Sequence, residues 1–131
     1  MHRPLQPEGW PTPAGYANGV VARGRTIFLA GQVGWNAEGR FDSDDLVAQI
    51  AQALRNVVAV LACDRAGPEH VTSLVWYFVD KQEYINRLSE VGKVYRDIMG
   101  KNFPAMTAVQ VSALIEDRAK VEIQATAVVQ D

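Results

Sequence analysis

The chain has 131 residues, of which 48% are apolar and 21% charged, a composition typical of one soluble globular domain. Its 13 Lys and Arg against 15 Asp and Glu give a formal net charge of -2, which disfavours a nucleic-acid-binding protein that works by bulk positive charge. The single cysteine excludes an internal disulfide, and one cysteine with two histidines is too few for a zinc cluster. No apolar run reaches the roughly 18 residues that span a bilayer. We therefore expect a cytoplasmic protein with no metal, membrane or nucleic acid as partner.

The chain begins with a proline-rich segment, residues 1–13, which predicts an extended arm because proline fixes φ and lacks a backbone donor. It contains no apolar segment of the kind found in secretory signals. Two short apolar runs, 18–22 and 26–33, flank Arg23-Gly24-Arg25 and predict a β-hairpin. Residues 34–42 hold glycines, an asparagine and charges and predict a surface loop. We expect the whole chain, 1–131, to form a single domain.

A first helix is predicted from residue 44 onward, with Ser43 as its N-cap and two acidic residues in its first turn. Apolar residues recur at steps of three and four and predict one buried face, formed by Leu46, Ile50, Leu54, Val57 and Leu61. Gly67-Pro68 ends this segment, and Cys63 is predicted to be a small buried apolar residue.

The second half of the chain predicts a strand at 71–80, a helix at 82–99, and strands at 106–114 and 121–129. The order β-β-α-β-α-β-β predicts an α+β fold in which two helices cover one face of a mixed sheet. We expect the other face of the sheet to be buried against further subunits, because it also carries large apolar residues.

Short segments along the whole chain carry a family resemblance: Gly15-Tyr16, residues 28–33 (FLAGQV), 52–57 (QALRNV), 75–80 (VWYFVD), 103–105 (FPA) and 121–123 (VEI). In this order they resemble the Rid/YjgF family, also known as L-PSP endoribonucleases or translation initiation inhibitors. The resemblance implies a chorismate-mutase-like fold and a homotrimer whose sheets line a central barrel, with ligand clefts between adjacent subunits. It also implies hydrolysis of reactive enamines and imines, such as 2-aminoacrylate, to ketoacids and ammonia.

The resemblance implies that Glu122 positions the attacking water and that Tyr16 contacts the ligand. At the other family positions this chain differs, with Met106 for an arginine, Ala30 for a serine, Ala108 for a cysteine, and Leu88 or Ser89 for an asparagine. The predicted cleft is therefore more apolar, and it has lost the cation that pairs with a substrate carboxylate. We accordingly expect a poor 2-aminoacrylate deaminase.

Other residues are candidates for the same cleft, each with a structural alternative. Gly31 and Gln32 stand at a strand edge where backbone can approach a ligand closely, or they form a bulge. Trp35, with Trp10 of the arm, could close over the cleft and would then favour a larger, aromatic ligand. Glu116 could contribute a second acid, although a solvated turn is favoured there.

Hydrolysis of a C=N bond needs no cofactor, and Glu122 could both hold the water and move its proton. The first hypothesis is therefore an imine or enamine deaminase for an apolar or aromatic-derived substrate, such as an aminomuconate-like molecule. The alternative is a non-catalytic trimer that binds a small metabolite or a partner protein. An endoribonuclease is disfavoured, because the acidic chain has neither a basic groove nor a histidine pair.

Overall fold

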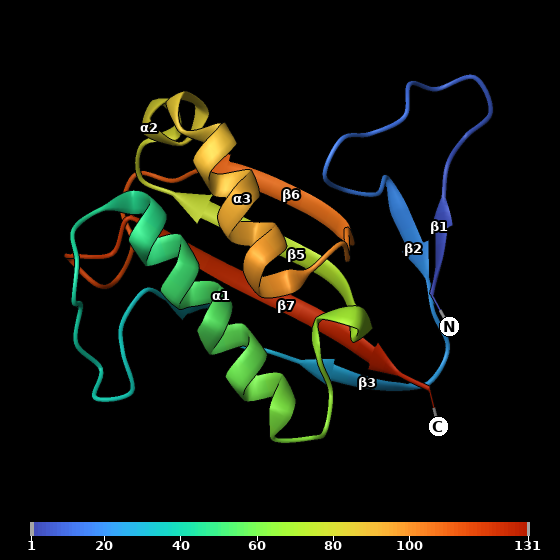
Figure 1. The fold of residues 1–131 in the computed structure, drawn as a ribbon, viewed down its shortest axis with the longest axis horizontal. Helices are drawn as coiled ribbons and strands as arrows, with labels where there is room; N and C mark the ends of the chain where they lie inside the picture. The colour runs from blue at the N-terminus through green and yellow to red at the C-terminus, as the bar shows by residue number, and fades with distance from the viewer. Residues whose placement is uncertain (1, 131) are drawn as a thin grey trace.

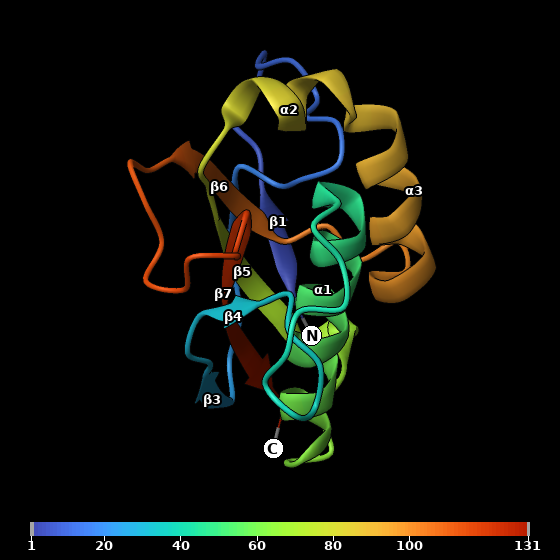
Figure 2. The same ribbon diagram turned by 90° about the vertical axis from the view of Figure 1, so that its left-hand side faces the viewer.

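The computed structural model describes residues 2–130 and shows an α+β fold, a mixed sheet with helices on one face (Figures 1 and 2). The strands of the main sheet are β3 (Arg25–Phe28), β4 (Gln32–Val33), β5 (Val71–Phe78), β6 (Ala105–Gln110) and β7 (Val121–Val129). The helices are α1 (Leu46–Ala62), α2 (Lys81–Asn86) and α3 (Leu88–Met99), with a short 3-10 turn, η1, at Pro68–His70. The predicted fold class is therefore confirmed for the single chain.

The long strand β7 organises the main sheet, whose order is β3-β7-β5-β6, with β4 also paired to β7. It runs antiparallel to β3, β4 and β5, whereas β6 runs parallel to β5 and forms one edge. Alternate residues of β7 are buried towards the helices, namely Val121, Ile123, Ala125 and Ala127. This leaves Glu122 and the other even-numbered residues of β7 on the face that no helix covers (Figure 2).

The apolar face of α1 packs on this sheet as predicted, because all five residues of the stripe are buried in the core. The helix begins at a different residue, however. Asp45 is the N-cap, and its side chain accepts from the backbone N–H of Ala48 at 3.0 Å. Ser43 instead accepts from the backbone N–H of Asp45 and so supports the cap from outside the helix. Cys63, at the end of α1, is exposed rather than buried.

The predicted hairpin of residues 18–33 is wrong. Strand β2 (Gly19–Val21) pairs with β1 (Arg3–Leu5) of the arm, and β3 pairs with β7. Local alternation of apolar residues identifies strands but not their partners, and here the turn between β2 and β3 leads from one sheet to the other. Gly24 allows this because its φ is +144°, and a Cβ there would overlap the carbonyl group of Val129.

The predicted helix 82–99 is also divided. It breaks at Arg87, which has a φ of -120° and separates α2 from α3. Asp80 caps α2 by accepting from two backbone N–H groups, and Arg87 pairs with Asp45 and Glu90 at the start of α3. Polar contacts of Arg87 therefore accompany the break between α2 and α3. An apolar stripe alone cannot predict such a break.

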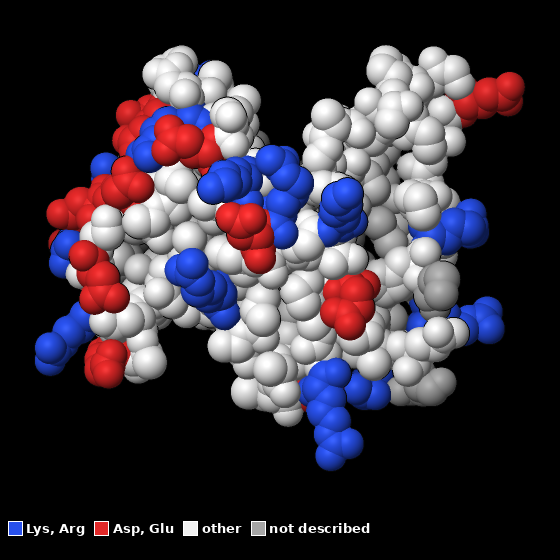
Figure 3. All heavy atoms as spheres, viewed as in Figure 1, with Lys and Arg blue, Asp and Glu red and all other residues white. Residues whose placement is uncertain are grey.

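The face seen in Figure 3 carries lysine and arginine interspersed with aspartate and glutamate, and no extended basic surface appears on it. Within residues 2–130, none of the helices is long and apolar enough to cross a membrane.

Candidate functional site

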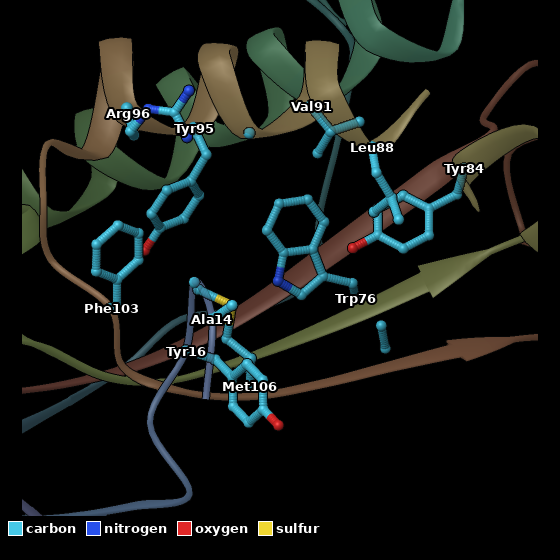
Figure 4. A pocket seen from close by; sticks show the side chains of 13 residues that line it. Ala14, Tyr16, Trp76, Tyr84, Leu88, Val91, Tyr95, Arg96, Phe103 and Met106 are labelled. Carbon is cyan, nitrogen blue, oxygen red and sulfur yellow. The ribbon is translucent and has the colours of Figure 1, made fainter. Parts of the chain in front are cut away.

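A cavity of about 450 Å³ lies between α3, the β5–β6 edge of the sheet and the end of the arm (Figure 4), and we call it the α3 cavity. Its volume falls in the range of about 300–1,000 Å³ that is usual for small-molecule sites. The residues that line it are Ala14, Gly15, Tyr16, Trp76, Tyr84, Leu88, Val91, Gly92, Tyr95, Arg96, Phe103, Met106 and Ala108.

Aromatic rings form much of this cavity. The ring centroids of Trp76 and Tyr95 lie 6.3 Å apart, and those of Tyr95 and Phe103 lie 5.7 Å apart. The Tyr95 hydroxyl donates to the backbone carbonyl of Asn102, which fixes the ring. Burial raises the pKa of Tyr95 and of Tyr84 above the ordinary phenol value, so both hydroxyls stay protonated at neutral pH.

Trp76 and Arg96 each bring to the α3 cavity a donor that has no protein partner among the described residues. The indole N–H of Trp76 is buried and makes no hydrogen bond, and its ring nitrogen points towards Ala14 and Met106 in Figure 4. Arg96, on the helical wall, has a guanidinium for which no ion pair or hydrogen bond is found within residues 2–130. A Cβ at position 92 would lie 3.2 Å from Arg96 Nη1, so Gly92 leaves room for the arginine beside the helix.

Three of the residues implied by the family resemblance meet in the α3 cavity: Tyr16, Met106 and Ala108. Met106 and Ala108 are in register with Leu74 and Trp76 on the neighbouring parallel strand, which places them on the helix-covered side of the sheet. Leu88, near the family's asparagine position, lines the cavity as well. The expectation of a cleft without a cation does not hold for this cavity, because Arg96 reaches it from α3.

Glu122 lies on the other side of the sheet and is not among the residues that line the α3 cavity. It is half-buried, paired in register with Val33 of β4 and Tyr77 of β5. Its carboxylate lies against Gly31, and a Cβ at position 31 would overlap Glu122 Oε2. The bare backbone at Gly31, between β3 and β4, therefore accommodates the acid.

The remaining candidate residues also lie outside the α3 cavity. Gln32 donates to the backbone carbonyl of Ala30 at 3.1 Å, beside Gly31. Glu116 lies in the turn before β7, where its carbonyl accepts from the N–H of Ala119. Trp35 packs against Phe41 in the loop before α1, with ring centroids 6.0 Å apart.

The two tryptophans that could have closed over a cleft do not converge. The loop that carries Trp35 and the arm that carries Trp10 lie at opposite ends of the long axis in Figure 1. Within the described residues, no three His, Cys, Asp or Glu side chains gather closely enough to hold a metal ion.

Sequence reasoning missed Arg96 and the open donor of Trp76. A signal for Arg96 was present, since Gly92 and Arg96 are four residues apart and flank the apolar stripe that contains Val91 and Tyr95. The free indole N–H had no such signal, because its lack of a partner depends on the packing of α3, β6 and the arm together.

Comparison with known proteins identifies the family of the chain. Residues 10–129 match the family model described as endoribonuclease L-PSP. A RutC family protein of Pyrococcus horikoshii is 30% identical over 121 residues, which cover 92% of each chain. A protein of Capra hircus named 2-iminobutanoate/2-iminopropanoate deaminase is 33% identical over 119 residues, which cover 90% of this chain and 83% of that relative.

Solved structures agree with these relatives. The Rid-family protein YyfB of Yersinia pestis, whose function is unknown, superimposes with a TM-score of 0.85 at 32% identity and 98% coverage of both chains. Rv2704 of Mycobacterium tuberculosis, a member of the YjgF/YER057c/UK114 family, superimposes with a TM-score of 0.65 at 34% identity, covering 88% of this chain and 87% of the other. The chain therefore belongs to the Rid/YjgF family of endoribonuclease L-PSP-like proteins.

Proposed function

We propose that this protein is a hydrolytic deaminase of imine or enamine intermediates that carry an apolar or aromatic substituent. Relatives named 2-iminobutanoate/2-iminopropanoate deaminase support the reaction class. The proposed substrate preference is based on the α3 cavity, which is large and aromatic and has Met106 and Ala108 on its sheet side. A three-carbon imino acid would leave most of its 450 Å³ unfilled.

The reaction requires one water molecule and one proton carrier. The carboxylate of Glu122 takes a proton from water as the water oxygen bonds to the carbon of the protonated imine, which gives a carbinolamine. The Glu122 carboxyl group then returns this proton to the nitrogen. As the C–N bond breaks and ammonia leaves, the hydroxyl proton passes to the freed Glu122 carboxylate and the oxygen becomes a carbonyl. An enamine first takes a proton at carbon to become the protonated imine. Glu122 suits this role because its carboxylate makes no hydrogen bond or ion pair within residues 2–130 and stands beside the bare backbone of Gly31.

The active cleft is proposed to lie between two subunits of a homotrimer, because one chain holds Glu122 and the α3 cavity on different sides of its sheet. A second copy would bring its Glu122 to the cavity of the first. The helix-free face also offers an apolar surface for association, since Phe28, in register with Thr126 of β7, is 81% exposed.

The test uses imines made in place by an amino-acid oxidase, with semicarbazide trapping the imine that survives. We expect the protein to accelerate hydrolysis of the phenylalanine-derived imine more than that of the alanine-derived imine. Glu122→Gln should lower this acceleration by about 10²-fold, the usual effect of losing a general acid–base group. Glu116→Gln is the matched control and should retain activity, because Glu116 lies in the turn before β7, whereas Glu122 stands on β7 beside Gly31.

A non-catalytic metabolite-binding trimer is the second candidate, favoured by the separation of Glu122 from the cavity within one chain. Binding of an aromatic ligand by the wild-type protein with no acceleration of any imine would establish this alternative. Turnover lost in Glu122→Gln, with ligand affinity kept, would establish the deaminase.

A further inference from the structure

Trp76 and Arg96 each present a hydrogen-bond donor to the largely aromatic α3 cavity. Trp76 is only 4% exposed, yet its indole N–H has no acceptor among the described residues. Most buried donors in folded proteins are paired, since an unpaired one has lost its hydration without compensation. The nitrogen points into the cavity, towards Ala14 and Met106 (Figure 4), so an acceptor there must come from outside the chain.

The second donor is Arg96, which stands on the helical wall of the same cavity. Arg87, at the start of α3, is engaged by Asp45 and Glu90, whereas the Arg96 guanidinium has no ion pair or hydrogen bond within residues 2–130. A guanidinium can pair with a carboxylate through two parallel hydrogen bonds. Since Arg96 is exposed, it can meet such a group at the mouth of the cavity without being buried itself.

We propose that the α3 cavity binds an aromatic 2-oxo or 2-imino acid. Its ring lies among the aromatic walls, its carboxylate pairs with Arg96, and its 2-oxo oxygen or 2-imino nitrogen accepts from the indole N–H of Trp76. As a statement about the substrate this rests on the proposed deaminase, whereas as a statement about binding it stands without turnover. The positive anchor therefore comes from α3, and Met106 on β6 widens the space for the ring.

Three related probes separate the contacts: phenylpyruvate, 3-phenylpropanoate, which lacks the 2-oxo group, and 1-phenylpropan-2-one, which has a methyl group in place of the carboxylate. Calorimetry should show that Arg96→Gln weakens binding of both acids about tenfold, as expected for a charge-assisted hydrogen bond, and leaves the ketone unchanged. Lys93→Gln, which removes the same charge from an exposed position of α3 outside the cavity, should change binding less than about twofold. Trp76→Phe should weaken phenylpyruvate more than it weakens 3-phenylpropanoate, because only phenylpyruvate has a group that accepts from the indole N–H.

A nuclear magnetic resonance measurement on the wild-type protein covers the case in which Trp76→Phe fails to fold. The chain has three tryptophans, so three indole N–H signals are expected. Phenylpyruvate should move the signal of Trp76 downfield and leave those of Trp10 and Trp35 in place. The proposal is overturned if phenylpyruvate does not bind, if Arg96→Gln binds it as well as wild type does, or if the Trp76 signal stays unchanged at saturation.

These outcomes are distinct from failure of the deaminase proposal. Binding that depends on Arg96 and Trp76, with no imine hydrolysis, would refute the deaminase and keep this site. Imine hydrolysis that is indifferent to Arg96→Gln would keep the deaminase and refute this site.

Discussion

Gly31 and Glu122 form the closest steric fit among the candidate site residues. The carboxylate of Glu122 occupies the space that any side chain at position 31 would need. Gly31 does not have a positive φ, so alanine would be compatible with its backbone, and the requirement for glycine is one of space alone. The carboxylate of Glu122, the proposed proton carrier, can therefore take this position only because residue 31 has no side chain.

Gly31→Ala should displace the Glu122 carboxylate and lower the rate of imine hydrolysis by about tenfold to 10²-fold, because small misplacements of a catalytic group are costly. Gly19→Ala is the matched control, since a Cβ at position 19 would meet only the side chain of Leu5, at 3.4 Å. Both variants should keep a melting temperature near that of wild type. Full activity in Gly31→Ala would contradict the role assigned to Glu122.

At the level of elements, the start of α1 joins two helices. Asp45 caps α1 and also pairs with Arg87, which stands between α2 and α3. The hydrogen bond from Arg87, with that from the Ala48 N–H, lowers the pKa of Asp45 below its ordinary 3.8. A lowered carboxyl pKa contributes stability that is complete above the ordinary pKa and is lost as the pH falls through the value in the folded protein.

Asp45→Ala should lower the free energy of unfolding at pH 7 by about 1 kcal/mol, the usual effect of losing an N-cap. Ser43→Ala should cost less, because Ser43 supports the cap but does not bond to the helix itself. Asp45→Asn keeps a capping oxygen, and it should flatten the loss of stability that we expect for wild type at acid pH. Chemical denaturation at pH 3 and pH 7 measures all three effects. An equal loss in Ser43→Ala and Asp45→Ala would contradict the assignment of the cap.

Elements with a complete periodic pattern could be predicted from the sequence. The buried stripe of α1 and the alternation in β7 each identify an element and its inward face. Strand partners could not be predicted, because β2 and β3 have equally apolar patterns yet join different sheets. Nor could the break at Arg87, which depends on polar contacts with Asp45, a residue distant in the sequence.

The candidate site, too, could be predicted only in part. Tyr16, Met106 and Ala108 line one cavity, and Gly31 lies beside Glu122. The two sets of residues lie on opposite sides of the sheet. This separation could not be predicted by matching positions along a chain, since a motif does not reveal which side of a sheet its residues face.

For the whole molecule, the separation of Glu122 from the α3 cavity within one chain predicts complementation between two inactive variants. Glu122→Gln removes the acid, and Ala108→Trp fills the α3 cavity while leaving the acid in place. Each should be inactive alone, and co-expressed subunits that mix at random should regain about one quarter of wild-type activity, because each interface has one chance in four of pairing an intact acid with an open cavity. Size-exclusion chromatography with light scattering checks that the mixed assembly is a trimer. No recovery in mixed trimers would place both groups of a working site in one chain.

The segments that line the α3 cavity differ in local stability. Its helix and sheet sides belong to the packed core, whereas Ala14, Gly15 and Tyr16 extend from an arm whose own sheet has two strands. A hydrogen bond of 2.9 Å from the Ala17 N–H to the Pro104 carbonyl, next to an isolated bridge between Ala17 and Ala105, attaches that segment to β6. Partial unfolding costs least where few contacts hold the backbone. For the ligand proposed above, we therefore expect detachment of this segment to be the easiest exit, so that the residence time depends on the arm as much as on the groups that recognise the ligand.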